Sequence, residues 1–337
     1  MFEFTYNLRS MSDGIREKCY NSLQRQCTIL WVAMRRDTEK PGSAVSLPGP
    51  WVPGGSCPPE RRSFTLPATY AHFSMGRETA RLLEPAALGV ITQAPQLYSI
   101  GLHGPDLFFY YKPLSKNPVN QLGHGLHDRP GREFFERAAR VLKAHPDSVA
   151  HRAYVYGFLC HFVLDTLSHD YVAEAMAATG LSHTRIETEL ERTLMLQDGL
   201  EPVSHHTTGH LVPSEENAVV IADFFPELTV EQVLDSLRGM IFYLDLLVAP
   251  SALKRWAIFT ALRLAGQYEN LGGLVMVPEP EPRCEPSNAE LLRRLEQAAE
   301  QAARLIAGFD RVEASGLAEE PLYGRTFDPR PEQGEPA

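Results

Sequence analysis

Residues 161–169, HFVLDTLSH, lie within the apolar run AYVYGFLCHFVLDTLSHDYV (153–172). At about 3.6 residues per turn, positions 161, 165 and 169 fall within roughly 80° of one another around a helix axis. His161, Asp165 and His169 therefore share one face of a predicted helix. Burying a carboxylate and two imidazoles is costly unless their charge and hydrogen-bonding groups are compensated, and a metal ion does this well. The alternative is that each is an ordinary core residue with a separate buried partner.

The composition predicts a globular protein and disfavours a nucleic-acid polymer as partner. The chain has 337 residues, is 44% hydrophobic and carries a formal net charge of −10. An acidic chain has no general means of neutralising a phosphate backbone. No apolar run reaches the ~18 residues of a membrane span, and the N-terminus lacks the pattern of a secretory signal, so we expect a cytoplasmic location.

Cysteine usage gives no sign of a disulfide framework or a thiolate zinc site. The five cysteines are scattered, and no two are arranged as C-x-x-C. The twelve histidines, in contrast, all lie between residues 72 and 210. Any imidazole chemistry is therefore expected in the middle of the chain.

Three regions follow from the patterning along the chain. Residues 1–65 have a basic excess and contain a long Pro/Gly-rich stretch, which predicts a disordered extension, or one that is not translated if the true start is Leu66. Residues 66–310 show helical spacing of apolar residues and few strand-like alternations, which predicts an all-α domain built as a multi-helix bundle. Two capping-box patterns, at Thr229 and at Ser287, predict helix starts. Residues 311–337 are expected to form a flexible tail.

Further histidines and carboxylates lie near the central helix in sequence. Ser182 is placed to cap a helix that would put His183 and Glu187 four residues apart on one face. Such a pair alone is usually a solvated surface pair. The loop motif GLHGPD (101–106) offers Asp106, and GLHDRP (125–130) offers His127. We expect His103, His124, His145 and His151 to be ordinary loop or surface residues, with His103 a neighbour of Asp106, and SHHTTGH (204–210) to be a polar connection.

Five segments carry a resemblance to a known family. They are PATYAHF (67–73), GLHGPDLFFYYKP (101–113), HDRPGREFFERAA (127–139), GFLCHFVLDTLSH (157–169) and LSHTRIETELE (181–191). In order and spacing they resemble the zinc-dependent phospholipase C family found in many bacteria. The resemblance extends over roughly residues 66–270 and implies an all-α bundle around a cluster of two to three zinc ions.

The resemblance also implies a ligand set for each ion. Asp106, His127, His161 and Asp165 would surround one zinc. His169, His183 and Glu187 would hold a second. His72, with Asp165 as a bridging ligand, would serve the third, although secreted members also use an N-terminal Trp that has no counterpart before His72 here.

The chemistry expected of such a cluster is phosphodiester hydrolysis. Zinc bound by nitrogen and oxygen ligands lowers the pKa of coordinated water toward ~7 and stabilises charge on phosphate oxygens. The leading interpretation is a phosphodiesterase of the phospholipase C type that cleaves phospholipid headgroup esters, with Asp106 as ligand and general base. Two alternatives stay open: a nuclease- or nucleotidase-like phosphoesterase of the same fold, and a non-catalytic metal-bound structural or sensing protein.

The expected partner is a phospholipid or another small phosphate ester. The segment APSALKRWAIFTALRLAG (249–266) either lies on an anionic lipid surface as a peripheral contact or packs as a buried helix with its basic residues reaching outward. The sequence predicts no oligomeric state.

Overall fold

The computed structural model describes residues 68–315 and 320–328. Within these residues it contains helices and no strand, so the prediction of an all-α, multi-helix fold is confirmed. Residues 1–65 lie outside the described residues. The helices, in chain order, are α3 (Thr69–Leu82), α4 (Pro85–Gln93), α5 (Pro95–Gly101), η1 (Gly104–Tyr110), α6 (Pro118–His127), α7 (Gly131–Ala144), α8 (Val149–Thr179), α9 (His183–Gln197), α10 (Glu215–Ala222), α11 (Val230–Leu247), α12 (Ala252–Leu264), α13 (Tyr268–Leu271), η2 (Gly272–Leu274), η3 (Pro282–Cys284), α14 (Glu285–Ser315) and η5 (Pro321–Gly324).

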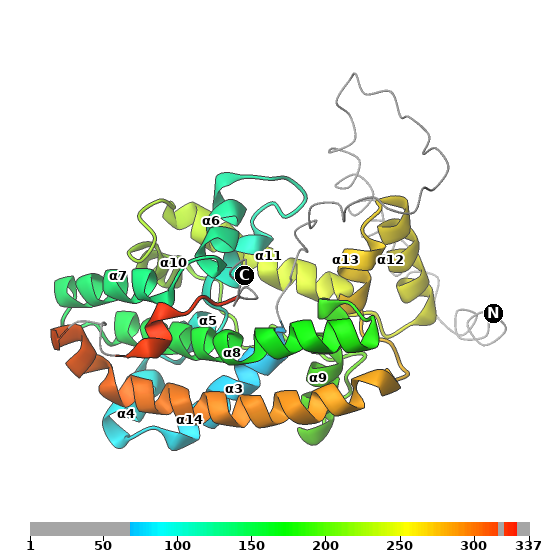
Figure 1. Ribbon diagram of the computed structural model, residues 1–337. Helices are drawn as coiled ribbons and strands as arrows, with labels where there is room; N and C mark the ends of the chain where they lie inside the picture. The colour runs from blue at the N-terminus through cyan, green and yellow to red at the C-terminus, as the bar shows by residue number, and fades with distance from the viewer. Residues whose placement is uncertain (1–67, 316–319, 329–337) are drawn as a thin grey trace, which may run out of the picture.

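Helix α8 is the centre of the fold. It runs for 31 residues, starts where the Ser148 hydroxyl accepts a hydrogen bond from the His151 N–H, and ends at Gly180 in the left-handed conformation, with φ of 69°. It is buried without a break from residue 153 to residue 166. Figure 1 shows α8 crossing the middle of the molecule with α14 alongside it. A helix that is apolar all round must be covered on every side, and its neighbours supply that cover.

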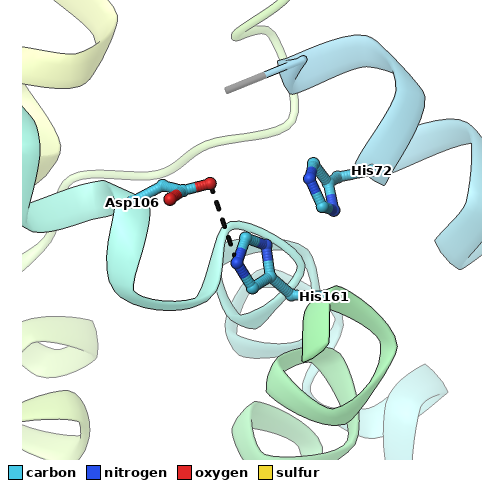
Figure 2. A group of neighbouring side chains, drawn as sticks. All are labelled: His72, Asp106 and His161. Carbon is cyan, nitrogen blue, oxygen red and sulfur yellow. Dashed lines mark ion pairs between the residues drawn. The ribbon is translucent and has the colours of Figure 1, made fainter. Parts of the chain in front are cut away.

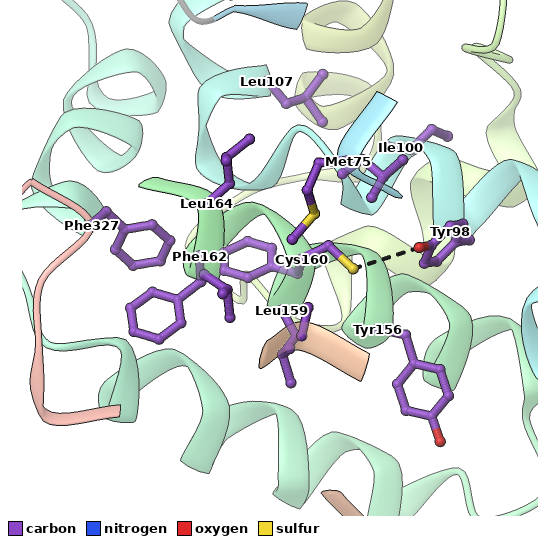
Figure 3. Close-up of a cluster of buried hydrophobic side chains, with 14 of the residues drawn as sticks. Met75, Tyr98, Ile100, Leu107, Tyr156, Leu159, Cys160, Phe162, Leu164 and Phe327 are labelled. Carbon is purple, nitrogen blue, oxygen red and sulfur yellow. Dashed lines mark hydrogen bonds between the residues drawn. The ribbon is translucent and has the colours of Figure 1, made fainter. Parts of the chain in front are cut away.

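Aromatic and aliphatic side chains from several elements pack around α8. Phe158 stacks on Phe134 of α7 with ring centroids 3.5 Å apart. Figure 3 shows Met75, Leu107 and Ile100 gathered around the middle of α8, where the hydroxyl of Tyr98 lies 3.5 Å from the sulfur of Cys160. The Tyr98 hydroxyl also donates to the Gly76 carbonyl at 2.8 Å, which joins α3, α5 and α8.

Two glycines allow α5 to approach α8 closely. A Cβ added at Gly157 would lie 2.2 Å from the Tyr98 carbonyl oxygen, and one at Gly101 would lie 2.4 Å from the Tyr154 carbonyl oxygen. Both obstacles are backbone atoms, which cannot turn aside as a flexible side chain can. The contact between these helices therefore requires glycine at both positions.

The two capping-box predictions had different outcomes. At Thr229 the box is confirmed, because its hydroxyl accepts from the Gln232 N–H while the Gln232 side chain accepts from the Thr229 N–H. At Ser287 the prediction was wrong. Helix α14 already begins at Glu285, directly after η3, and the Ser287 hydroxyl donates to the Cys284 carbonyl instead.

The predicted tail lies partly within the described residues, and there it packs. Tyr323 and Phe327 are 0% and 1% exposed. Tyr323 contacts Phe135, with ring centroids 4.9 Å apart, and Phe327 contacts Phe162 at the same distance. In Figure 1 this red segment lies against α7 and α8. Residues 320–328 thus complete the core beside α8.

Helices α11 and α12 meet at a sharp bend. No single helix of the described residues is long and apolar enough to cross a membrane. Taken together, α11 and α12 meet the criteria of length and composition, but they are bent by 117°.

The close approach of α5 and α8 predicts opposite effects of alanine at two helical glycines. Gly157→Ala should lower the free energy of unfolding by about 1–3 kcal/mol, because the new methyl group meets backbone atoms. Gly89→Ala in α4, where a Cβ would meet nothing within 4 Å, is the matched control. It should raise the free energy of unfolding by about 0.5–1 kcal/mol. Denaturant titration measures both, and a Gly157→Ala protein as stable as wild type would contradict the packing.

Candidate metal centre

The polar face of α8 forms the first side of the site. His161 Nε2 lies 3.0 Å from Asp165 Oδ2, and His169 Nε2 lies 3.7 Å from Asp165 Oδ1. His161 and Asp165 are 0% and 2% exposed. The shared helical face predicted from the spacing of these residues is therefore present, and it points into the interior.

The second side of the site comes from η1 and α6. His127 Nε2 lies 2.9 Å from Asp106 Oδ1, and His161 Nε2 lies 3.7 Å from Asp106 Oδ2. His127 Nδ1 lies 2.9 Å from the Gly123 carbonyl oxygen, an acceptor for a proton on that nitrogen. Burial lowers the pKa of His127, but the hydrogen bond to Asp106 raises it to about 9, so Nε2 carries a proton that a bound cation would replace.

The turn before η1 is shaped by glycine. Gly104 has φ of 46°, and a Cβ there would lie 2.2 Å from Cδ2 of His161. Glycine relieves both the backbone strain and this collision. Its presence lets η1 bring Asp106 down onto the histidine face of α8.

Helix α3 supplies His72 to the same centre. His72 Nε2 lies 3.3 Å from Asp165 Oδ1, and its ring stacks on that of His161 at 4.4 Å. Figure 2 shows His72, Asp106 and His161 facing a common space from α3, η1 and α8. Asp165 thus has histidines at both oxygens, because Oδ2 faces His161 and lies 3.9 Å from His127 Nε2.

Helix α9 adds the last predicted pair. The Ser182 hydroxyl accepts from the Arg185 N–H and caps the helix, as predicted. His183 Nε2 lies 2.8 Å from Glu187 Oε1, and His169 Nε2 lies 3.7 Å from the same oxygen. The pair is largely shielded from solvent, with each side chain 11% exposed, because α9 packs its first turns toward α8.

All eight residues named from the sequence gather at this centre. Three sets of ligand-type atoms each lie within 4.8 Å of one another. The sets are His72, Asp106 and His161; His127, His161 and Asp165; and His169, His183 and Glu187. His161 belongs to the first two sets, and the third is joined to them where His169 Nε2 lies 3.7 Å from Asp165 Oδ1, so the three form one connected cluster.

Several atoms of the cluster are buried without a hydrogen bond in the described part of the chain. They include His161 Nε2, Asp165 Oδ2 and Glu187 Oε2, together with Nδ1 of His72, His161 and His169. His161 Nε2 and Asp165 Oδ2 lie only 3.0 Å apart, yet they are not aligned as donor and acceptor. Buried polar atoms without partners are costly, and nitrogen and oxygen atoms aimed at a common space suit a cation such as Zn²⁺. The donor set therefore fits zinc.

The histidines keep the carboxylates of the cluster ionised. Burial favours the neutral form of Asp165, but the charges of His161, His169 and His72 hold its pKa well below the usual range. Burial acts in the same sense on Glu187, yet His183 and His169 lower its pKa to about 2. Ionised carboxylates are the form that binds a cation.

Two carboxylates near the site were not predicted from the sequence. Asp328, in the expected tail, borders the small cavity at the cluster. Glu191 accepts a hydrogen bond from the Tyr70 N–H at the start of α3. Burial raises the pKa of Glu191 to about 7. The spacing of Glu191, four residues after Glu187, was a signal that could have placed it on the inner face of α9.

Other histidines are placed as follows. His103 is fully buried, and its Nε2 lies 2.6 Å from Nε2 of His210, so His103 is a core residue rather than a surface one. Burial holds the pKa of His103 well below its usual range and lowers that of His210 to about 4. His151 lies 3.0 Å from Asp223, and its ring stacks on that of His145, away from the eight-residue cluster.

A larger cavity adjoins the cluster and shares Glu187 with it. Its volume is about 60 Å³. Apolar side chains line much of it, among them Met195, Leu244, Leu247 and Met276. The cluster therefore opens beside a space suited to an apolar group.

Comparison with known proteins identifies the class of this site. Residues 71–234 match the family model described as zinc dependent phospholipase C. This confirms the resemblance drawn from the five segments, and the match includes all eight residues of the cluster. Residues 71–234 are thus similar to a zinc-dependent phospholipase C domain. No curated protein and no solved structure matches the chain.

The cluster predicts that Asp165 is needed for metal binding. We expect at least two zinc ions per chain in the wild-type protein, and Asp165→Asn should lose most of them. An amide of the same shape leaves the positive charges on its two sides uncompensated. Zinc is measured by mass spectrometry after dialysis.

The control is His206→Ala, because His206 pairs with Asp245 at 2.8 Å and is exposed. It should bind zinc as wild type does. Full zinc content in Asp165→Asn would contradict the assignment.

Proposed function

We propose that the protein is a zinc-dependent phosphodiesterase of the phospholipase C type, acting on phospholipid headgroup esters. The observation that carries this proposal is the single buried cluster in which Asp165 has a histidine at each carboxylate oxygen. Such a carboxylate is suited to bridge two cations. The family match supports zinc-dependent phospholipid hydrolysis at the level of the family.

The proposed ligand sets follow the contacts. Asp106, His127, His161 and Asp165 would hold one zinc. His169, His183 and Glu187 would hold a second. His72 with Asp165 would take part in a third. Bound zinc would supply an acidified water and positive charge for the phosphate oxygens.

Asp106 is the proposed general base. It is 3% exposed and is held from one side by His127 Nε2 at 2.9 Å. It borders the small cavity, so its carboxylate lies where a substrate phosphate would be bound. From there it would accept a proton from the attacking water, since a carboxylate in contact distance of a water needs no further movement to do so.

The surroundings of the cluster support a lipid substrate. The adjoining cavity is lined by apolar residues of α9 and α11, including Met195, Leu244 and Leu247. Contact with these side chains would favour the apolar portion of a lipid substrate. The net charge of −10 also disfavours a polynucleotide.

A direct assay distinguishes this function from its alternatives. Zinc-loaded wild-type protein should release phosphocholine from phosphatidylcholine. Asp106→Asn should lower kcat by about 10²–10⁴-fold, the usual effect of removing a general base. His206→Ala should retain wild-type turnover.

Two other results would overturn the proposal. Release of nucleotides without phosphocholine would assign the site to a nuclease- or nucleotidase-like phosphoesterase. Absence of both activities in zinc-loaded protein would assign it to a non-catalytic metal-bound protein.

Helix α12 supports contact with a phospholipid bilayer as part of this function. Leu253, Trp256 and Leu264 are 44%, 64% and 79% exposed. At 100° per residue they lie within roughly 80° of one another, so the outward face of α12 is apolar. The helix begins shortly after Leu247 and Val248, which line the cavity. We propose that this face rests on the lipid surface and brings the cavity near its substrate.

This proposal predicts a selective defect in the Trp256→Ser, Leu264→Ser double variant. Binding to sedimented phosphatidylcholine vesicles should weaken at least several-fold, because two exposed apolar anchors are lost. Hydrolysis of a short-chain, monomeric phosphatidylcholine should be unchanged. Leu196→Ser removes a residue that is 59% exposed on α9 and is the control. Equal vesicle binding by the double variant and the control would refute the membrane contact.

A further inference from the structure

The segment of residues 320–328 lies outside the family match, yet it reaches the metal centre. Phe327 contacts the rings of His127 and His161, with centroids 5.4 and 5.9 Å apart. Figure 3 shows Phe327 beside Phe162 of α8. An apolar side chain of this segment therefore closes the cluster from the side of α7.

Backbone contacts fix the segment next to the site. The Gly131 N–H donates to the Arg325 carbonyl at 2.9 Å, and the Thr166 hydroxyl donates to the Thr326 carbonyl at 3.3 Å. The Asp328 N–H donates to the carbonyl of His127 at 3.4 Å. These bonds tie the position of Asp328 to α7 and to α6 and α8, which carry four of the proposed ligands.

The Asp328 carboxylate meets the outer nitrogen of His169. Asp328 Oδ1 is in ion-pair contact with His169 Nδ1, and no other group of the described residues offers that nitrogen a hydrogen bond. The other nitrogen, Nε2, faces Asp165 Oδ1 and Glu187 Oε1, each at 3.7 Å. His169 therefore stands between a carboxylate outside the cluster and two carboxylates inside it.

Imidazole chemistry gives this arrangement a consequence. A neutral imidazole has one N–H and one lone pair. A carboxylate at Nδ1 favours the tautomer with its proton there, which leaves the lone pair on Nε2 and makes that nitrogen a better metal ligand. The same contact fixes the rotation of the ring.

We propose that Asp328 is a positioning residue that orients His169 and fixes its tautomer for metal binding. This inference rests on the proposed zinc site. It extends the functional unit beyond residues 71–234, because a residue near the end of the chain then contributes to the cluster. Asp328 acts through His169 and binds no ion itself.

Two variants with side chains of similar size test whether an oxygen at position 328 must accept the proton on His169 Nδ1. Asp328→Asn keeps an oxygen that can accept the Nδ1 proton, whereas Asp328→Leu has none. Zinc affinity is measured by competition with a chromophoric chelator. Asp328→Leu should weaken binding of the zinc held by His169 about 10–100-fold. The zinc affinity of Asp328→Asn should lie between those of Asp328→Leu and the wild-type protein. The visible spectrum of the cobalt-substituted protein should change in Asp328→Leu and be restored toward wild type in Asp328→Asn.

A double-mutant cycle separates positioning from a merely structural role. In the His169→Ala background, Asp328→Leu should cause no further loss of zinc affinity, because its effect passes through the missing ring. An additive loss would show that Asp328 only anchors the segment, and would overturn the inference. Asp245→Ala, which breaks the exposed pair with His206, is the control and should bind zinc as wild type does.

The outcomes also distinguish this inference from the proposed function. Absence of zinc in the wild-type protein would refute the proposed function itself. Zinc in the wild type with unchanged affinity in Asp328→Leu would refute only the role of Asp328. Melting of the metal-free proteins shows any loss of fold. Even if both variants melt at a lower temperature than the wild-type protein, the difference in zinc affinity between Asp328→Asn and Asp328→Leu still measures the effect of the accepting oxygen.

Discussion

The burial of the Asp165 carboxylate is the constraint on which the rest of the structure depends. An ion in the middle of an apolar helix would cost several kcal/mol if left unpaired. Here its two oxygens meet histidines from α3, α6 and α8, and these hold its pKa low. Helices α3, α6 and α9 and the turn η1 each bring at least one polar group to this cluster. The bundle is therefore arranged around a charge as much as around an apolar core.

Both the packing of the core and the metal centre require neighbouring elements to approach α8 closely. Helix α8 is covered on all sides, so its neighbours must come close to it. Gly157 permits the approach of α5, and Gly104 permits η1 to lie over the ring of His161. The first contact packs the core, and the second delivers Asp106 to the cluster. A side chain at Gly157 would separate α5 from α8, and one at Gly104 would move Asp106 away from His161.

Sequence reasoning succeeded where the relevant contacts are local. The spacing of four residues placed His161, Asp165 and His169 on one face, and placed His183 beside Glu187, because helical geometry alone decides these neighbours. The joining of the two helices into one cluster came from the family resemblance. Asp328 was not predicted, since it follows a Pro- and Gly-containing stretch without periodicity and is brought to His169 by long-range contacts, namely the packing of Phe327 and the hydrogen bonds of residues 325–328. The helix start at Ser287 was misplaced for a related reason: the preceding η3 turn continues directly into α14.

The charge of the cavity bears on how many ions the cluster can hold. Four carboxylates border it, from Asp106, Asp165, Glu187 and Asp328. With neutral histidines, two divalent cations would balance them. A third would leave two positive charges in excess in a buried site, which is unfavourable unless an anion enters with it. A phosphodiester and a hydroxide each carry one negative charge and together would supply that balance. The third position, at His72, is therefore the one whose occupancy should depend most on substrate, and the two sets centred on α8 and α9 are the ones that the protein itself can neutralise.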